Sequence, residues 1–90
     1  MWKKVGGRMI VELNGKVYGM SLKGFKGILK IASSAVPFGI YAICKNQTAI
    51  MLNEKYESIE KLEKAVSKYK RNGFEVYYNR NIEYVKGEDK

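Results

Sequence analysis

The chain contains no histidine, and this absence excludes several classes of site. A Ser–His–Asp triad, a Cys–His dyad and a zinc site built with histidine all need an imidazole. The single cysteine, Cys44, cannot form an internal disulfide, and its place in the apolar run 40–44 predicts a small packed side chain. No nucleophile–base pair or metal-ligating set is visible. We therefore expect a protein that is not an enzyme and that uses no metal and no cofactor.

Long apolar runs are also lacking. No stretch approaches the roughly 18 residues needed to cross a bilayer, and the first residues lack the apolar core and cleavage site of a signal peptide. The sequence therefore predicts a cytoplasmic protein with no membrane partner.

A single proline and a hydrophobic content of 46% are typical of a folded chain. We expect residues 1–90 to form one domain with loosely ordered tails at 1–7 and 87–90.

Positive charge is concentrated in the first half of the chain. The formal net charge is +8, and residues 1–50 carry eight basic side chains against the single acidic residue Glu12. Residues 51–90 are nearly balanced, with nine basic and eight acidic side chains. A one-sided positive field attracts polyanions and speeds their encounter. The distribution favours nucleic acid, DNA or RNA, or an acidic protein as the partner; a solubilising surface is the structural alternative.

The dipeptide Asn14-Gly15 predicts a β-hairpin in the first half. Both residues accept the positive φ that a type I′ turn requires, and we expect strands at 8–13 and 16–20. Ser21 follows as an N-cap, because its hydroxyl can accept a hydrogen bond from a free backbone N–H. Apolar residues at helical spacing then predict a helix over 22–34.

A second hairpin is expected from strands at 38–45 and 48–55, joined at Asn46-Gln47. Both faces of this hairpin are apolar. Strands of that kind lie centrally in a sheet or in a dimer interface, so the pattern also fits a homodimer. Strict alternation assigns Ile40, Ala42, Cys44, Ala49 and Met51 to one face and Tyr41, Ile43, Ile50 and Leu52 to the other.

A second helix is expected after Ser58, which can cap it, and Gly73 is its expected stop. The segment 74–78 alternates as a strand, residues 79–81 are expected to turn, and a final strand is expected at 82–85. The resulting order is ββαββαβ(β). We expect an α+β, two-layer fold in which an antiparallel sheet carries both helices on one face.

Four glutamates precede or begin the second helix and are interleaved with lysines. Paired carboxylates can bind metals or act as acid and base, but alternating charges on a helix are typical of a salt-bridged surface. We expect such a surface here, formed by Glu54, Glu57, Glu60 and Glu63.

The segment Gly24-Phe-Lys-Gly27 combines glycines with basic residues at the start of the first helix. Glycines near a helix start let a phosphate reach backbone N–H groups, where the dipole favours negative charge. With the helix, two strands and helix that follow, the tetrapeptide resembles the GxxG loop of KH domains, which clamp single-stranded nucleic acid. A KH domain has a helix before this loop, whereas a hairpin is expected here. The resemblance therefore does not assign the chain to that family.

Three lysines, which we call the lysine ridge, form the most coherent binding feature. At 100° per residue Lys23, Lys26 and Lys30 lie within about 60° of one another; a solvated helix face is the structural alternative. Near the C-terminus, an aromatic and basic cluster is formed by Tyr77, Tyr78, Arg80 and Tyr84, and an exposed ring in it could stack on a base. Tyrosines packed with their hydroxyls in water are the alternative there. The candidate nucleic-acid-binding residues are Arg8, Lys16, Lys23, Gly24, Lys26, Gly27, Lys30, Tyr77 and Arg80.

These features favour a small basic, non-enzymatic nucleic-acid-binding protein that contacts phosphates through the lysine ridge. Binding of this kind weakens steeply with salt. The alternative is a small protein-binding regulator or inhibitor, of the type made by phages and mobile elements, that docks its basic face on an acidic partner.

Overall fold

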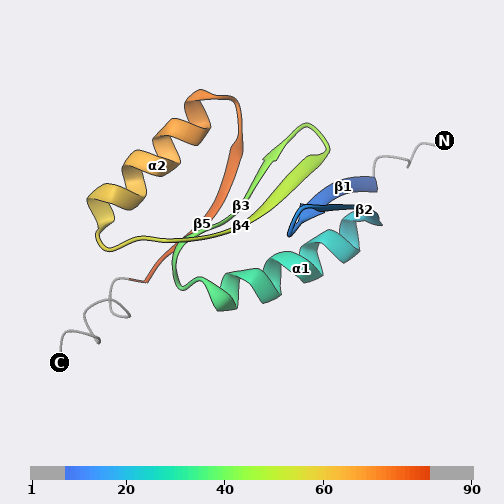
Figure 1. Cartoon of the computed structure of the whole chain (residues 1–90), viewed down its shortest axis with the longest axis horizontal. Coiled ribbons are helices and arrows are strands. Elements are labelled where there is room, and N and C mark those ends of the chain that lie inside the picture. The colour runs from blue at the N-terminus through green and yellow to red at the C-terminus, as the bar shows by residue number, and fades with distance from the viewer. Residues whose placement is uncertain (1–7, 82–90) are drawn as a thin grey trace.

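The computed structural model describes residues 8–81, which form an α+β fold around a five-stranded sheet (Figure 1). The predicted α+β class and the order ββαββαβ are confirmed. The expected strand at 82–85 and both expected tails lie outside the described residues. The elements are β1 (Arg8–Leu13), β2 (Lys16–Ser21), α1 (Leu22–Ala35), β3 (Phe38–Lys45), β4 (Thr48–Lys55), α2 (Ile59–Arg71) and β5 (Glu75–Arg80).

Two short turns form the two hairpins. Asn14 and Gly15 both have positive φ, at 55° and 83°, as the predicted type I′ turn requires. The turn sets the pairing of Leu13 with Lys16 and of Met9 with Met20. In the second hairpin Asn46 has φ 60°, and Lys45 pairs with Thr48 across the turn.

The sheet is mixed, which corrects the prediction of a purely antiparallel one. The strand order is β2-β1-β4-β3-β5. Because β4 lies beside β1, the two hairpins meet through a parallel pairing that runs from Ile10–Thr48 to Glu12–Ile50. The backbone N–H of Ile10 donates to the carbonyl of Gln47 at 2.9 Å, at the start of this ladder. All other pairings are antiparallel.

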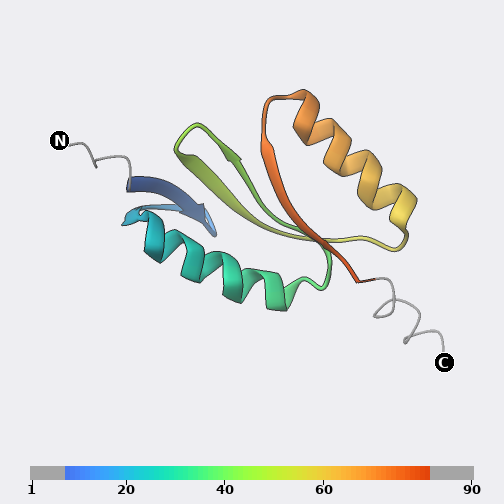
Figure 2. The ribbon, with the colours of Figure 1, turned by 180° about the vertical axis from the view of Figure 1, so that it is seen from behind.

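The helices lie on opposite faces of the sheet, so the expectation of both on one face was wrong. Figures 1 and 2 show the sheet between α1 and α2. The physical reason is that β3 and β4 are apolar on both faces, and each face needs a cover. One core contains Met9, Val11, Phe25, Cys44 and Ala49 under α1, and the other contains Phe38, Ile40, Ile43, Leu62 and Val66 under α2.

A bulge in β3 changes which side chains share a face. The register shifts between Ile40 and Ala42 on both sides of the strand. Ile40 therefore packs in the α2 core with Ile43, although strict alternation assigned them to opposite faces. The Tyr41 ring lies beside Tyr77, whose ring packs on the α1 side.

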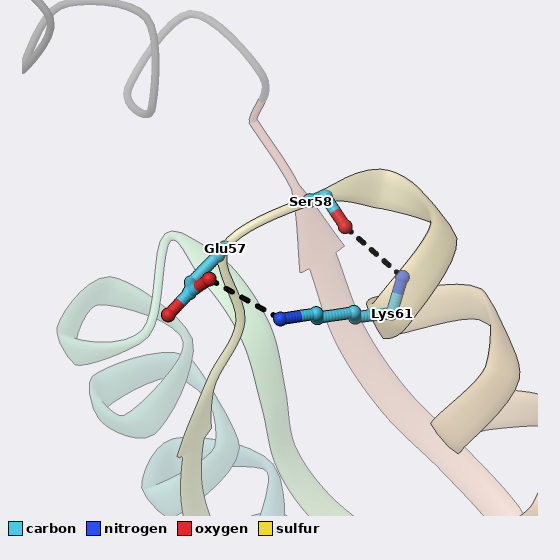
Figure 3. A network of polar contacts seen from close by, with 3 residues as sticks. All are labelled: Glu57, Ser58 and Lys61. Atoms are coloured by element: carbon cyan, nitrogen blue, oxygen red, sulfur yellow. Dashed lines mark hydrogen bonds and ion pairs between the residues drawn. The ribbon is translucent and has the colours of Figure 1, made fainter.

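The start of α2 is fixed by local polar contacts, drawn in Figure 3. The hydroxyl of Ser58 accepts the backbone N–H of Lys61 at 3.2 Å, which confirms the predicted cap. The Lys61 ammonium also lies 3.2 Å from a Glu57 carboxylate oxygen in an exposed ion pair. Gly73 has φ 90° just beyond the helix, as a stop requires.

Candidate nucleic-acid interface

The lysine ridge lies on the exposed side of α1. Phe25 is buried against the sheet, and Leu29 packs beside it in the same core. The helical spacing turns Lys23, Lys26 and Lys30 away from this buried side, and all three are exposed. The helix sequence contains no acidic residue. The ridge therefore carries positive charge with no carboxylate on the same helix.

The ion pairs lie elsewhere. Within residues 8–81 two ion pairs form, Lys61–Glu57 and Arg80–Glu63, and both belong to the α2 side of the sheet. Glu54, also on that side, accepts hydrogen bonds from the Tyr56 and Tyr69 hydroxyls at 2.8 and 2.9 Å. Three of the four expected surface carboxylates therefore have structural partners. The ion pairs thus lie on the α2 side, whereas α1 itself carries lysines and no carboxylate; a carboxylate on the α1 side of the sheet is that of Glu75 in β5.

Tyr77 packs against the helix that carries the lysine ridge. It lies on the α1 face of β5, where its ring meets Phe25 edge-on with centroids 6.2 Å apart. Phe25 is the residue before Lys26 in α1. The ring of Tyr41 lies 6.3 Å from Tyr77 and is tilted by 40°. The site thus combines the flank of a basic helix with two half-buried tyrosines of the adjacent sheet.

The environment of Tyr77 favours its neutral form. Burial raises the pKa of its hydroxyl, and the nearby Glu75 carboxylate raises it further. The hydroxyl donates to the Glu75 Oε1 atom at 3.4 Å. At neutral pH this side chain is an uncharged aromatic with a hydrogen-bond donor, and the carboxylate beside it belongs to Glu75.

Arg80 is not part of this surface. Successive side chains of a strand point to opposite faces of the sheet, so Tyr77 and Arg80, three positions apart in β5, face opposite ways. Arg80 points to the α2 face, where its guanidinium lies 3.1 Å from a Glu63 carboxylate oxygen. Tyr78 packs in the α2 core as well. The strand thus divides the aromatic and basic cluster expected near the C-terminus, and its fourth member, Tyr84, lies outside the described residues.

Arg8 and Lys16 lie at opposite ends and on opposite faces of the first hairpin. Arg8 pairs with Ser21 on the face opposite α1, and its guanidinium lies over Gly19. Lys16 begins β2 on the α1 face, across from Leu13, and is exposed. Leu13 lines the other flank of α1, so the sheet and the helix separate these two cations from Lys26 and Lys30.

Gly24 and Gly27 lie inside α1 rather than in a loop. The hydroxyl of Ser21 accepts the Gly24 N–H at 3.1 Å, which confirms the predicted cap and occupies a donor that a phosphate would use. A Cβ atom at Gly27 would meet nothing within 4 Å, and one at Gly24 would make ordinary contacts. Neither glycine is required by close packing, and the resemblance to a KH loop does not extend to the structure.

An apolar groove on the opposite flank of α1 was not predicted from the residue pattern. Its volume is about 440 Å³, and it lies between the Asn14 turn, α1 and the second half of β4. Ile28, Ile31 and Met51 are among its lining residues. The nearest sequence signal is Ile31, an apolar residue outside the buried stripe, which is 74% exposed.

The described part of the chain offers no group of three or more Cys, Asp or Glu side chains placed to hold a metal ion. None of its helices has the length and apolar character needed to cross a membrane. The chain matches no protein-family model, no curated protein and no solved structure in the three comparisons made with known proteins.

Proposed function

We propose that this protein binds nucleic acid without catalysing a reaction, and that it contacts phosphates through Lys23, Lys26 and Lys30. The observation that supports this proposal is the charge separation between the two helices. The α1 helix presents three exposed lysines and no carboxylate, whereas glutamates are interleaved with lysines on α2. A cytoplasmic location, expected from the sequence, would agree with this role.

The chemistry of the ridge suits a phosphate backbone rather than a base edge. Lysine ammonium groups act as mobile point charges and lack the planar fork with which arginine reads paired acceptors. Such contacts fix position and supply affinity but do not specify sequence. Tyr77 and Tyr41 add aromatic surface beside the helix that carries the ridge, which can take part in stacking with unpaired bases. We infer binding with little sequence preference.

A salt titration with duplex DNA, single-stranded DNA and RNA tests the proposal. Each lysine that neutralises a phosphate contributes about −0.9 to the slope of log K against log salt on duplex DNA, and about −0.7 on a single strand. Replacing Lys23, Lys26 and Lys30 together by Gln should therefore reduce the steepness of the slope by roughly 2 to 3 and weaken binding at low salt.

The matched control removes the same charge from α2. Lys64, Lys68 and Lys70 are also exposed, and a triple Gln variant at these positions has the same net charge as the ridge variant. It should bind nearly as the unaltered protein does. Undetectable binding of all three nucleic acids at low salt, or equal losses in both triple variants, would overturn the proposal.

The second candidate function is a regulator that docks on an acidic protein. The apolar groove beside α1 favours it, because exposed Ile31 lies between this groove and the basic side of the helix. An acidic amphipathic partner would match both surfaces. A pull-down from nuclease-treated lysate with the unaltered protein and with Ile31→Glu separates the two functions. One partner retained by the former and lost by the latter supports the regulator, and no such partner counts against it.

A further inference from the structure

Exposed apolar side chains gather around the edge strand β2. Of the five large hydrophobic residues that are exposed within residues 8–81, four lie on β2 or directly beside it. Val17 is 67% exposed on one face of the strand, and Tyr18 is 44% exposed on the other. Ile10 on β1 pairs with Gly19 and lies diagonally from Val17, and Leu22 follows β2 at the start of α1. The fifth residue, Ile31, lies on α1, where it lines the apolar groove together with Leu13 and Asn14 of the hairpin turn.

The backbone of β2 has an open side as well. In a hairpin with a two-residue turn the pair next to the turn, here Leu13–Lys16, is hydrogen-bonded, and bonded pairs then alternate along the strands. Tyr18 and Met20 therefore bond to β1, whereas the N–H and C=O groups of Val17 and Gly19 point outward. The Ile10 N–H, which belongs to the pair Ile10–Gly19, indeed bonds to Gln47 on the other side of β1.

The other edge strand of the sheet lacks these features. β5 carries Glu75 and Arg80 at its two ends, and the latter is held by an ion pair to α2. Charged side chains at an edge are a recognised protection against further strand pairing. β2 has one charge, Lys16 at its first position, and then an uncharged run without proline to Ser21. The open edge of β2 is thus the sheet edge that is available for pairing with a further strand.

We propose that β2 pairs antiparallel with β2 of a second copy of this chain, which joins two sheets into one across a two-fold axis. The antiparallel direction follows from charge, because it places the two Lys16 side chains at opposite ends of the pair, whereas a parallel pair would set them side by side. A second strand also covers both faces of β2 at once, so Val17 and Tyr18 are shielded together. A two-fold contact closes and leaves no further open β2 edge.

Sedimentation equilibrium and amide hydrogen exchange on the full chain test this pairing. Raising the protein concentration from about 10 µM to about 1 mM should shift the mass from monomer towards dimer. In the same range the Val17 and Gly19 amides should exchange about tenfold more slowly, while the Tyr18 and Met20 amides, already bonded to β1, should change little. This alternation is specific to pairing through the outer edge of β2.

Variants at the edge and at an exposed hydrophobe outside β2 complete the test. Val17→Lys should weaken dimerisation tenfold or more, and Val17→Pro should do the same because it removes an outward N–H that β1 does not use. Ile31→Lys removes a more exposed apolar side chain and should leave dimerisation unchanged. A monomer mass up to about 1 mM, a dimer without slower exchange at Val17 and Gly19, or equal effects of Val17→Lys and Ile31→Lys would each overturn the proposal.

Discussion

The side-chain amide of Asn79 holds the C-terminal end of α1 through Ser33, although the two residues are far apart in the chain. The Asn79 Nδ2 atom donates to the Ser33 carbonyl at 2.9 Å and to its hydroxyl at 2.8 Å, and it also lies 3.0 Å from the Val36 carbonyl. The last carbonyls of a helix have no partner within the helix. The Val36 N–H reaches the Ala32 and Ser33 carbonyls, and the Asn79 amide from β5 adds a side-chain donor that fixes the helix carrying the lysine ridge to the sheet.

Replacing Asn79 by Ala should therefore destabilise the protein. The Ser33 carbonyl keeps the Val36 N–H at 3.3 Å, but the partly buried Val36 carbonyl loses its side-chain donor, which costs about 1 to 3 kcal/mol. Urea denaturation measures the free energy of unfolding. Asn53→Ala, at an exposed position of β4, is the control and should cost little. Equal losses in the two variants would contradict the role of Asn79.

Gly27→Ala should stabilise the protein. Glycine within a helix is roughly 1 kcal/mol less favourable than alanine, and a methyl group at this position enters open space. If the lysines rather than the glycines make the phosphate contacts, nucleic-acid affinity should stay unchanged in the same variant. Thermal denaturation measures the stability, and the salt titration measures the nucleic-acid affinity. A variant that is more stable but binds nucleic acid more weakly would show that Gly27 takes part in binding.

Gly39→Ala should have the opposite effect on stability. A Cβ atom at Gly39 would overlap the backbone carbonyl of Glu54 on the neighbouring strand, and backbone cannot move aside as a flexible side chain can. We expect a loss at least as large as a typical core substitution, about 2 kcal/mol or more. A denaturation midpoint like that of the unaltered protein would show that β3 and β4 can separate here.

Stability should fall at high pH through Tyr56. Burial and the hydrogen bond to Glu54 raise the pKa of its hydroxyl to about 12, whereas an unfolded tyrosine titrates near its ordinary value of 10.0. The folded state keeps the proton that the unfolded state loses, so this contribution is complete below pH 10 and declines as the pH rises towards 12.

Tyr56→Phe isolates that contribution. At pH 8 the variant should be less stable, because the hydrogen bond to Glu54 is gone. The difference from the unaltered protein should then narrow as the pH is raised above 10, since only the latter loses the tyrosine contribution. Urea midpoints of both proteins across this range provide the measurement, and parallel curves would contradict the assignment.

Local chemistry in the sequence was sufficient to predict which segments form the helices and strands. Asn14-Gly15 favours a turn in which both residues have positive φ, and this predicts the first hairpin. Ser21 and Ser58 cap the helices that begin after them. The position of β1 beside β4 and the placement of the helices on opposite faces depend on long-range packing, which has no local signal. Residues 79–81 were expected to turn, yet β5 continues through Asn79 to Arg80 because both make tertiary contacts.

The candidate site was predictable to the same extent. The lysine ridge follows from helical spacing alone, so the structure retains it. The placement of Tyr77 beside Phe25 and of Arg80 beside Glu63 depends on which face each strand residue takes. Tyr41 lies on the α1 side only because of the bulge between Ile40 and Ala42, and no pattern in the sequence predicts this bulge.

The parallel ladder between β1 and β4 has a consequence for the order of folding. Each hairpin closes through a two-residue turn, and such closure takes microseconds. The three pairs from Ile10–Thr48 to Glu12–Ile50 join segments from different halves of the chain, and their closure costs far more chain entropy. The hairpins should therefore form early and the ladder late. Formation of the parallel ladder between β1 and β4 should therefore be the rate-limiting step of folding.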